Sequence, residues 1–310
     1  MKSKIVVNGY MSDEALAPLK EVFDVKSWTD AENVPDHVLE EWLYDAVGLC
    51  NFNPCLTINS DLLKRTPNLK VLIQAFPTYH NVRARELSSL PIRFVPMSTP
   101  ASNESIAEFI TILMGIVSRR IMENRIVQLT DTKISSSTMS KGKDLSRSTL
   151  GIIGMDDIGI SISRRARAFG MTVVYHNESP RNDDKLFMTT YRELDDLLAH
   201  SDVVIVMNSG RNSKKVMCNT SFFNAMKDDA IFISATTTEQ IDIDALRKTL
   251  HEGKLNYAAL AVDNEFDSNA LLETDKCLVV PMSAAFTERN IKEIDGVTVT
   301  RMIKELQNSL

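Results

Sequence analysis

One segment of the chain, residues 149–180, constrains its fold more than any other. It reads TLGIIGMDDIGISISRRARAFGMTVVYHNESP. An apolar run at 149–153 ends in a glycine, a second glycine follows five positions later, and a helical pattern then leads to another apolar run at 172–175. This order of strand, glycine turn, helix and strand is typical of a βαβ unit in a parallel sheet.

The glycine turn is close to the G-x-G-x-x-G pattern of dinucleotide-binding turns, with Gly154 and Gly159 at its two ends. The middle position, however, is Asp156. Glycine at that position lets bare backbone approach the pyrophosphate, which the helix N-terminus faces. A carboxylate adds bulk and negative charge, and like charges ~4 Å apart repel by roughly 4 kcal/mol at an effective dielectric constant of ~20. We therefore expect the fold to be kept and anion binding to be weakened.

The end of the second strand completes the candidate cofactor site. Where an acidic residue holds the adenosine ribose in such folds, this chain has Asn177 and Glu178. Glu178 could accept hydrogen bonds from a ribose diol and would repel a 2′-phosphate, which favours NAD over NADP. In a second interpretation, the carboxylate of Asp156 turns toward solvent or toward Arg164 and Arg165, and NAD still binds. The candidate cofactor-binding residues are Gly154, Met155, Asp156, Asp157, Ile158, Gly159, Asn177 and Glu178.

Strand-like apolar runs alternate with helical patterns along almost the whole chain. This alternation predicts an α/β fold with two doubly wound, Rossmann-like parallel sheets and a cleft between the two domains. Two long helical patterns, at 104–125 and 287–306, are candidates for crossings between the domains. Ser102 or Asn103 could cap the first of these helices.

Composition excludes several classes of protein. The chain has 310 residues and a net charge of −6, and its basic residues are scattered, which argues against binding to nucleic acid or to an anionic membrane. No apolar run is long enough to span a bilayer, and the amino terminus has no signal-peptide pattern. Four cysteines without paired-ligand spacing predict free thiols in the cytoplasm and no metal site. These are Cys50, Cys55, Cys218 and Cys277.

Short motifs along most of the chain resemble the D-isomer-specific 2-hydroxyacid dehydrogenase family, which includes glyoxylate and hydroxypyruvate reductases. The resemblance implies a dinucleotide-binding domain at 101–287, inserted in a flavodoxin-like substrate domain made of 1–100 and 288–310. It also implies a homodimer. The motifs are Ser105–Glu108, Leu150–Met155, Arg165–Met171, Leu197–Val204, Ala225–Lys227, Asp242–Leu246, Ala258–Leu260 and Pro281.

The chemistry of the family needs an arginine to hold the substrate carboxylate and a histidine as acid–base, with a glutamate that raises the pKa of the histidine. The flanking matches place Thr237 at the position of the arginine, Phe266 at that of the glutamate and Met282 at that of the histidine. A thioether cannot donate or accept a proton at a useful pH. Glu265 lies one place from Phe266, so a shifted alignment would restore a glutamate.

The predicted substrate segment is also altered. The family presents a valine–glycine pair whose amides hold the substrate carboxylate, and here the pair is Pro77-Thr78, after Phe76. Proline has no N–H to donate. Loss of one charge-assisted hydrogen bond costs about 1.5–3 kcal/mol.

Together these replacements favour a catalytically inactive family relative that binds an unknown small molecule or protein partner. The alternative is an NAD-dependent oxidoreductase of 2-keto or 2-hydroxy acids in which His80, Glu265 or Tyr79 donates the proton. A third interpretation is a purely structural or interaction protein.

Overall fold

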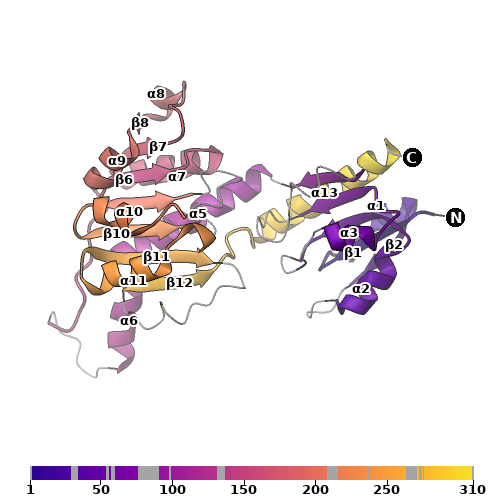
Figure 1. Cartoon of the computed structure of the whole chain (residues 1–310), viewed down its shortest axis with the longest axis horizontal. Coiled ribbons are helices and arrows are strands. Elements are labelled where there is room, and N and C mark those ends of the chain that lie inside the picture. Colours follow the sequence, from indigo (N-terminus) through magenta and orange to yellow (C-terminus); the bar gives the residue numbers. More distant parts are fainter. Residues whose placement is uncertain are drawn as a thin grey trace. The chain divides into compact units, whose positions relative to one another are not determined.

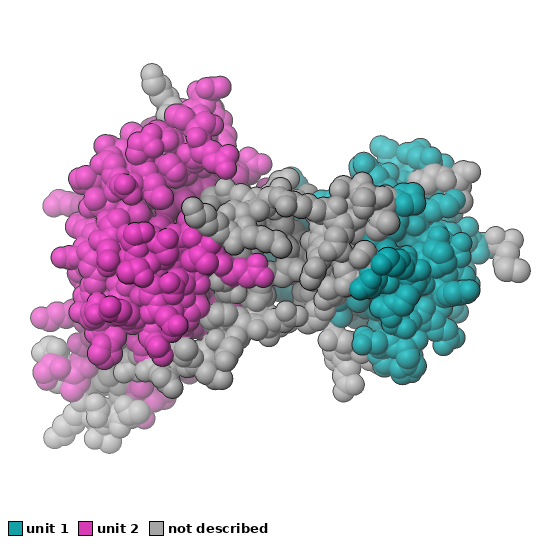
Figure 2. All heavy atoms as spheres, viewed as in Figure 1, with its two compact units in different colours: residues 1–102, 285–310 teal, residues 103–284 magenta. Residues whose placement is uncertain are grey.

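The structure is a computed structural model that describes residues 2–28, 34–53, 56, 60–75, 91–97, 99–130, 137–207, 216–235, 238–262, 271, 274 and 276–308. It contains two compact units, residues 1–102 with 285–310 (unit 1) and residues 103–284 (unit 2), shown in Figure 1 and Figure 2. Each unit has its own parallel sheet, so the predicted α/β class with two doubly wound sheets is confirmed. No described helix is long and apolar enough to cross a membrane.

Unit 1 is built on a five-stranded parallel sheet with the order β2-β1-β3-β4-β5, the flavodoxin-like order. Helices α1 and α13 pack on one face of the sheet, and α2 and α3 pack on the other. Strands β1, β3 and β4 are buried along nearly their whole length, which explains their continuous apolar runs. The elements are β1 Lys4–Asn8, α1 Asp13–Val22, β2 Asp24–Ser27, α2 Asp36–Leu43, β3 Ala46–Asn51, α3 Ser60–Lys64, β4 Val71–Gln74, β5 Arg93–Pro96 and α13 Glu288–Gln307.

Unit 2 is built on a seven-stranded parallel sheet with the order β12-β11-β10-β9-β6-β7-β8, the Rossmann order with one further strand. Helices α5 and α7 cover one face, and α9, α10 and α11 cover the other. The elements are α5 Pro100–Ser118, α6 Ile121–Thr130, β6 Thr149–Ile153, α7 Asp157–Ala168, β7 Thr172–His176, α8 Asp184–Phe187, β8 Thr190–Tyr191, α9 Leu194–His200, β9 Val203–Val206, α10 Thr220–Ala225, β10 Ala230–Ser234, the 3-10 helix η1 Thr238–Gln240, α11 Ile243–His251, β11 Leu255–Val262 and β12 Cys277–Pro281.

Helix α5 begins earlier than the sequence pattern suggests. Its first residue is Pro100, and the hydroxyl of Thr99 accepts a hydrogen bond of 3.0 Å from the backbone N–H of Ser102. Proline suits the first helical position because the N–H it lacks would have no helical partner there. The predicted caps, Ser102 and Asn103, are therefore wrong, and both residues lie inside the helix.

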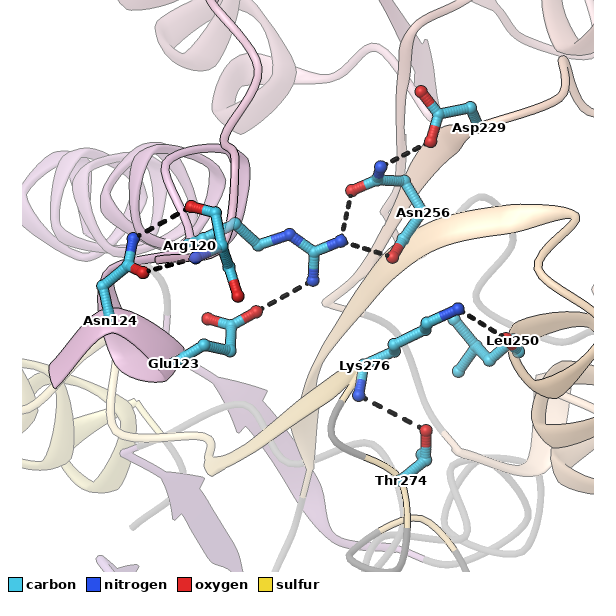
Figure 3. Close-up of polar contacts among 9 residues, drawn as sticks. Arg120, Glu123, Asn124, Asp229, Leu250, Asn256, Thr274 and Lys276 are labelled. Carbon is cyan, nitrogen blue, oxygen red and sulfur yellow. Dashed lines mark hydrogen bonds and ion pairs between the residues drawn. The ribbon is translucent and has the colours of Figure 1, made fainter. Parts of the chain in front are cut away.

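The long helix predicted over 104–125 is also interrupted. Arg120 has a left-handed φ of +54° and separates α5 from α6. Figure 3 shows its guanidinium between Glu123, at 2.8 Å, and Asn256, whose backbone and side-chain oxygens accept hydrogen bonds of 2.9 and 2.8 Å. The same guanidinium lies 4.5 Å from the centre of the Tyr257 ring. The contacts with Asn256 and Tyr257 of β11 stabilise a backbone conformation that residues other than glycine rarely adopt.

Candidate cofactor-binding site

The glycine turn lies at the carboxyl end of β6, where the strand order of the unit 2 sheet reverses between β9 and β7. Ligands of open α/β sheets bind at such a switch point. Gly154 has a φ of +97°, and a Cβ there would lie 3.2 Å from the Cβ of Met207. A Cβ on Gly159 would lie 3.1 Å from the sulfur of Met155. The two outer glycines thus allow the tight turn and the close packing of α7 on β6.

The carboxylate of Asp156 caps α7. Its Oδ1 accepts hydrogen bonds from the backbone N–H groups of Ile158 and Gly159, both at 3.0 Å. Uncapped amides at a helix N-terminus are the groups that bind anions such as phosphate. A contact of Asp156 with Arg165, one of the alternatives from the sequence, is not formed among the described residues. Arg165 instead pairs with Glu104 of α5 at 2.7 Å.

Asn177 holds the turn from the end of β7. Its Oδ1 accepts a 2.7 Å hydrogen bond from the N–H of Met155, and its Nδ2 donates to the carbonyl oxygen of Met155 at 3.3 Å. Arg181 donates to the same carbonyl oxygen at 3.1 Å and forms a two-point ion pair with Asp183, with both distances 2.8 Å. Hydrogen bonds from Arg181 lower the pKa of Asp183. Both polar backbone groups of Met155 are therefore engaged.

The remaining candidate cofactor residues differ in their exposure. The side chains of Asp157 and Glu178 are exposed, whereas Ile158 is half-buried. Asp156 is also exposed, so two adjacent carboxylates, those of Asp156 and Asp157, lie at the turn. This arrangement places negative charge where a dinucleotide would bring its pyrophosphate. Gly154 and Gly159 fit that group and Asp156 does not.

Met282 lies where the family resemblance expects the catalytic histidine. It directly follows β12, whose last residue, Pro281, pairs with Val262 of β11. The N–H of Met282 donates to the carbonyl oxygen of Val262 at 2.7 Å, and its side chain is 39% exposed. The described histidines lie on other elements: His37 in α2, His176 in β7, His200 in α9 and His251 in α11.

Several predicted site residues lie outside the described residues. On the catalytic side these are Thr237, Glu265, Phe266 and His80, together with Tyr79. On the substrate side they are Phe76, Pro77 and Thr78. Their roles stay predictions. No group of three potential metal-ligating side chains suitable for an ion is found among the residues that are described.

The sequence analysis missed a row of buried amides in unit 1. Asn8, Asn51 and Gln74 end β1, β3 and β4, and each is at most 2% exposed. Asn8 donates to Asn51, which donates to Gln74, both at 2.8 Å. The signal was visible, because three apolar runs each end in an amide, and carboxyl ends of parallel strands meet at one edge of a sheet. Gln74 and Ala75 lead directly into the predicted substrate segment.

The sequence of unit 2 matches a known family. Residues 111–284 match the profile of the NAD-binding domain of the D-isomer-specific 2-hydroxyacid dehydrogenases. This chain belongs to that family. Since the matched residues include the whole glycine turn, Asp156 stands in the NAD-binding domain of a D-2-hydroxyacid dehydrogenase fold.

Relatives extend the match to both units. The chain is 27% identical over 271 residues to a glyoxylate reductase of Thermococcus kodakarensis, covering 86% of this chain and 81% of the relative. It is 29% identical over 319 residues to glyoxylate/hydroxypyruvate reductase B of Salmonella paratyphi A, covering 100% and 97%. The relatives are thus reductases of the same family and of nearly the same length.

Solved structures agree with the fold. The TT0316 protein from Thermus thermophilus superimposes with a TM-score of 0.85 at 25% identity, covering 98% of this chain and 97% of that one. The D-lactate dehydrogenase from Aquifex aeolicus, solved with NAD and lactic acid, gives a TM-score of 0.83 at 23% identity, covering 99% and 96%.

Proposed function

We propose that this D-2-hydroxyacid dehydrogenase family member does not reduce 2-keto acids and instead binds a small molecule or a protein partner. The observation that carries the proposal is Met282 at the position of the catalytic histidine. Pro281 pairs with Val262, and the N–H of Met282 continues the same ladder, which supports Met282 as the residue that directly follows this strand. A thioether cannot perform the proton transfer that the reduction of a keto group requires.

Two further replacements support the proposal. Thr237 stands at the position of the carboxylate-binding arginine, and Phe266 at that of the glutamate. A threonine hydroxyl cannot replace the two-point, charge-assisted hydrogen bonding of a guanidinium. A phenyl ring has no carboxylate with which to raise the pKa of a histidine. Pro77 removes one more donor from the predicted substrate segment.

We also propose that dinucleotide binding is weakened, with NAD favoured over NADP. Asp156 and the exposed Asp157 oppose an approaching pyrophosphate, and the exposed Glu178 would repel a 2′-phosphate. Arg181 could have attracted that phosphate, but its charge is already paired with Asp183.

Turnover measurements test the proposal. The purified chain is incubated with NADH or NADPH and glyoxylate, hydroxypyruvate, pyruvate and longer 2-keto acids, beside a relative named as a glyoxylate/hydroxypyruvate reductase. We expect no oxidation of either cofactor above the protein-free rate. Turnover that disappears in the variant His80→Ala would contradict the proposal and support an unconventional proton donor.

That outcome corresponds to the second candidate function, an NAD-dependent oxidoreductase that uses His80, Glu265 or Tyr79. Its support is that relatives of the chain are glyoxylate reductases and that the family profile includes an NAD-binding domain. The variants Glu265→Gln and Tyr79→Phe would then identify the donor, because each removes one ionisable group with little change in size.

A homodimer in the cytoplasm remains part of the proposal. Helix α6 presents the apolar side chains of Ile121, Ile126 and Leu129, which are 50, 58 and 72% exposed. An exposed apolar face of this kind is common at interfaces between subunits. Replacing Ile126 and Leu129 by glutamate should halve the mass measured by light scattering. A wild-type chain of monomer mass would contradict the dimer. If the chain is instead a purely structural or interaction protein, it should bind no small-molecule ligand.

A further inference from the structure

We infer that the glycine turn of unit 2 carries its own anion, the carboxylate of Asp156, and is closed to the pyrophosphate of a dinucleotide. A ligand that binds at this edge of the sheet would then have no phosphate at the glycine turn. The inference rests on the proposed function, because it concerns the cofactor turn of a protein proposed to be inactive. It deepens that proposal by naming the chemical class of ligand that the turn excludes.

The first observation is that three amide donors of the turn already have partners. The N–H of Met155 donates to Asn177, at 2.7 Å. The N–H groups of Ile158 and Gly159 both donate to Oδ1 of Asp156, at 3.0 Å. A phosphate oxygen would have to displace these side-chain oxygens before it could accept a hydrogen bond from the same donors.

The second observation is that the side chains holding the turn are themselves held. Asn177 contacts both the N–H and the carbonyl oxygen of Met155, which fixes which end of its amide faces each group. Arg181 binds the same carbonyl oxygen and pairs at two points with Asp183. Its backbone N–H donates to the hydroxyl of the buried Tyr175 at 2.8 Å. The closed turn is therefore part of a connected network rather than one side-chain rotamer.

The third observation concerns charge. Asp156 forms no ion pair with a described residue, while Arg181 pairs with Asp183 and Arg165 pairs with Glu104. Asp157 adds a further exposed carboxylate one residue on. The exclusion is assigned to the occupied donors, and the charge adds to it.

Two substitutions separate these causes. Asp156→Gly removes the charge and the acceptor, and leaves the bare backbone that a pyrophosphate needs. Asp156→Asn removes only the charge, because asparagine is an equally good cap whose oxygen accepts the same two hydrogen bonds. Asp195→Asn is the matched control, since it removes an equal charge from an exposed position in the first turn of another helix, α9, and leaves the glycine turn and its cap intact.

The experiment is titration calorimetry of ADP and adenosine on the full chain at fixed salt. We expect wild type to bind ADP no more tightly than adenosine. Asp156→Gly should bind ADP at least tenfold more tightly than wild type, whereas Asp195→Asn should stay within threefold of wild type. Asp156→Asn should gain less than Asp156→Gly. Melting curves confirm folding, and Asp156→Ala, which also lacks an acceptor, replaces the glycine variant if that variant is unfolded.

Three results would overturn the inference. The first is wild-type binding of ADP tenfold or more tighter than adenosine. The second is a gain below tenfold in the variants that lack an acceptor. The third is an equal gain in Asp156→Asn, which would assign the exclusion to charge alone. Because ADP and adenosine undergo no chemistry, these results do not depend on the turnover test. Turnover by a chain with a closed turn would refute the proposed inactivity and keep the inference. An inactive chain with an open turn would refute the inference and keep the proposed inactivity.

Discussion

The buried carboxyl group of Asp295 makes the stability of unit 1 depend on pH. This residue lies in α13, is 6% exposed, and its Oδ1 has no hydrogen-bond partner in the described part of the chain. Burial raises its pKa from 3.8 to about 6. The folded chain therefore holds this proton more tightly than the unfolded chain does. The contribution of the protonated carboxyl group to the free energy of unfolding is fully present below pH ~4 and is lost as the pH rises through 6, by on the order of 3 kcal/mol.

We therefore predict that Asp295→Asn stabilises the protein at pH 7.5. The neutral amide avoids the cost of burying a charge, so the free energy of unfolding should rise by about 1–3 kcal/mol. At pH 4.5 the advantage should shrink by about 2 kcal/mol, because wild type is then largely protonated. Urea unfolding of both proteins at the two pH values measures the difference.

Asp24→Asn is the control for this measurement. Asp24 is an exposed acid on β2 of the same unit, so its replacement should change stability by less than about 0.5 kcal/mol at either pH. An advantage of Asp295→Asn that stayed constant with pH would show that the carboxyl group does not titrate in this range.

At the scale of elements, the junction between α5 and α6 combines an unfavourable backbone with favourable contacts. Arg120 adopts its left-handed φ while its side chain binds Glu123 and Asn256 (Figure 3). The same guanidinium stacks on the ring of Tyr257. Asn256 in turn donates to Asp229. The junction thus sets the direction of α6 through contacts with the sheet.

We predict that Arg120→Ala is less stable than Arg120→Gly by about 1 kcal/mol. Both variants lose the guanidinium contacts, but only glycine adopts the left-handed conformation without cost. Denaturant unfolding of the full chain measures the difference. Arg119→Ala, at the exposed neighbouring position, should cost less than either. A glycine variant no more stable than the alanine variant would show that the backbone at this junction is unstrained.

At the scale of the whole molecule, unit 1 needs both ends of the chain. The α13 side chains of Ile294, Val299, Met302 and Leu306 are buried in the same core as β1 and β3. Unit 2 has two apolar cores of its own, one on each face of its sheet.

We predict that a chain ending at residue 287 keeps unit 2 folded and loses unit 1. Removing even one buried Leu, Ile or Met side chain down to alanine costs about 2–5 kcal/mol, and four large ones leave together, more than the stability of a typical domain. Limited proteolysis should then yield a resistant fragment near residues 103–284. Met302→Ala in the full chain should weaken unit 1 without this loss. Equal protection of both units in the truncated chain would refute the prediction.

Much of the fold was predictable from the sequence. The lengths and apolar character of the strands, the glycines at 154 and 159, and the order of helices and strands predicted two parallel sheets, and the motifs predicted the family. Each of these features can be read from a short stretch of sequence, because the spacing of apolar residues follows the period of the helix or strand that they form. The placement of Met282 at the position of the catalytic histidine also comes from the sequence, and it stays a prediction.

Only the tertiary structure decided what these side chains bind. Asp156 was expected to repel an anion, but its role as the cap of α7 depends on the backbone angles at the turn. Asn177 reaches Met155 across 22 residues, and Arg120 reaches Asn256 across 136. A residue pattern carries little information about such partners, because they meet only after the sheet has brought distant segments together. The helix over 104–125 was mispredicted for the same reason: the contacts that hold its break come from β11.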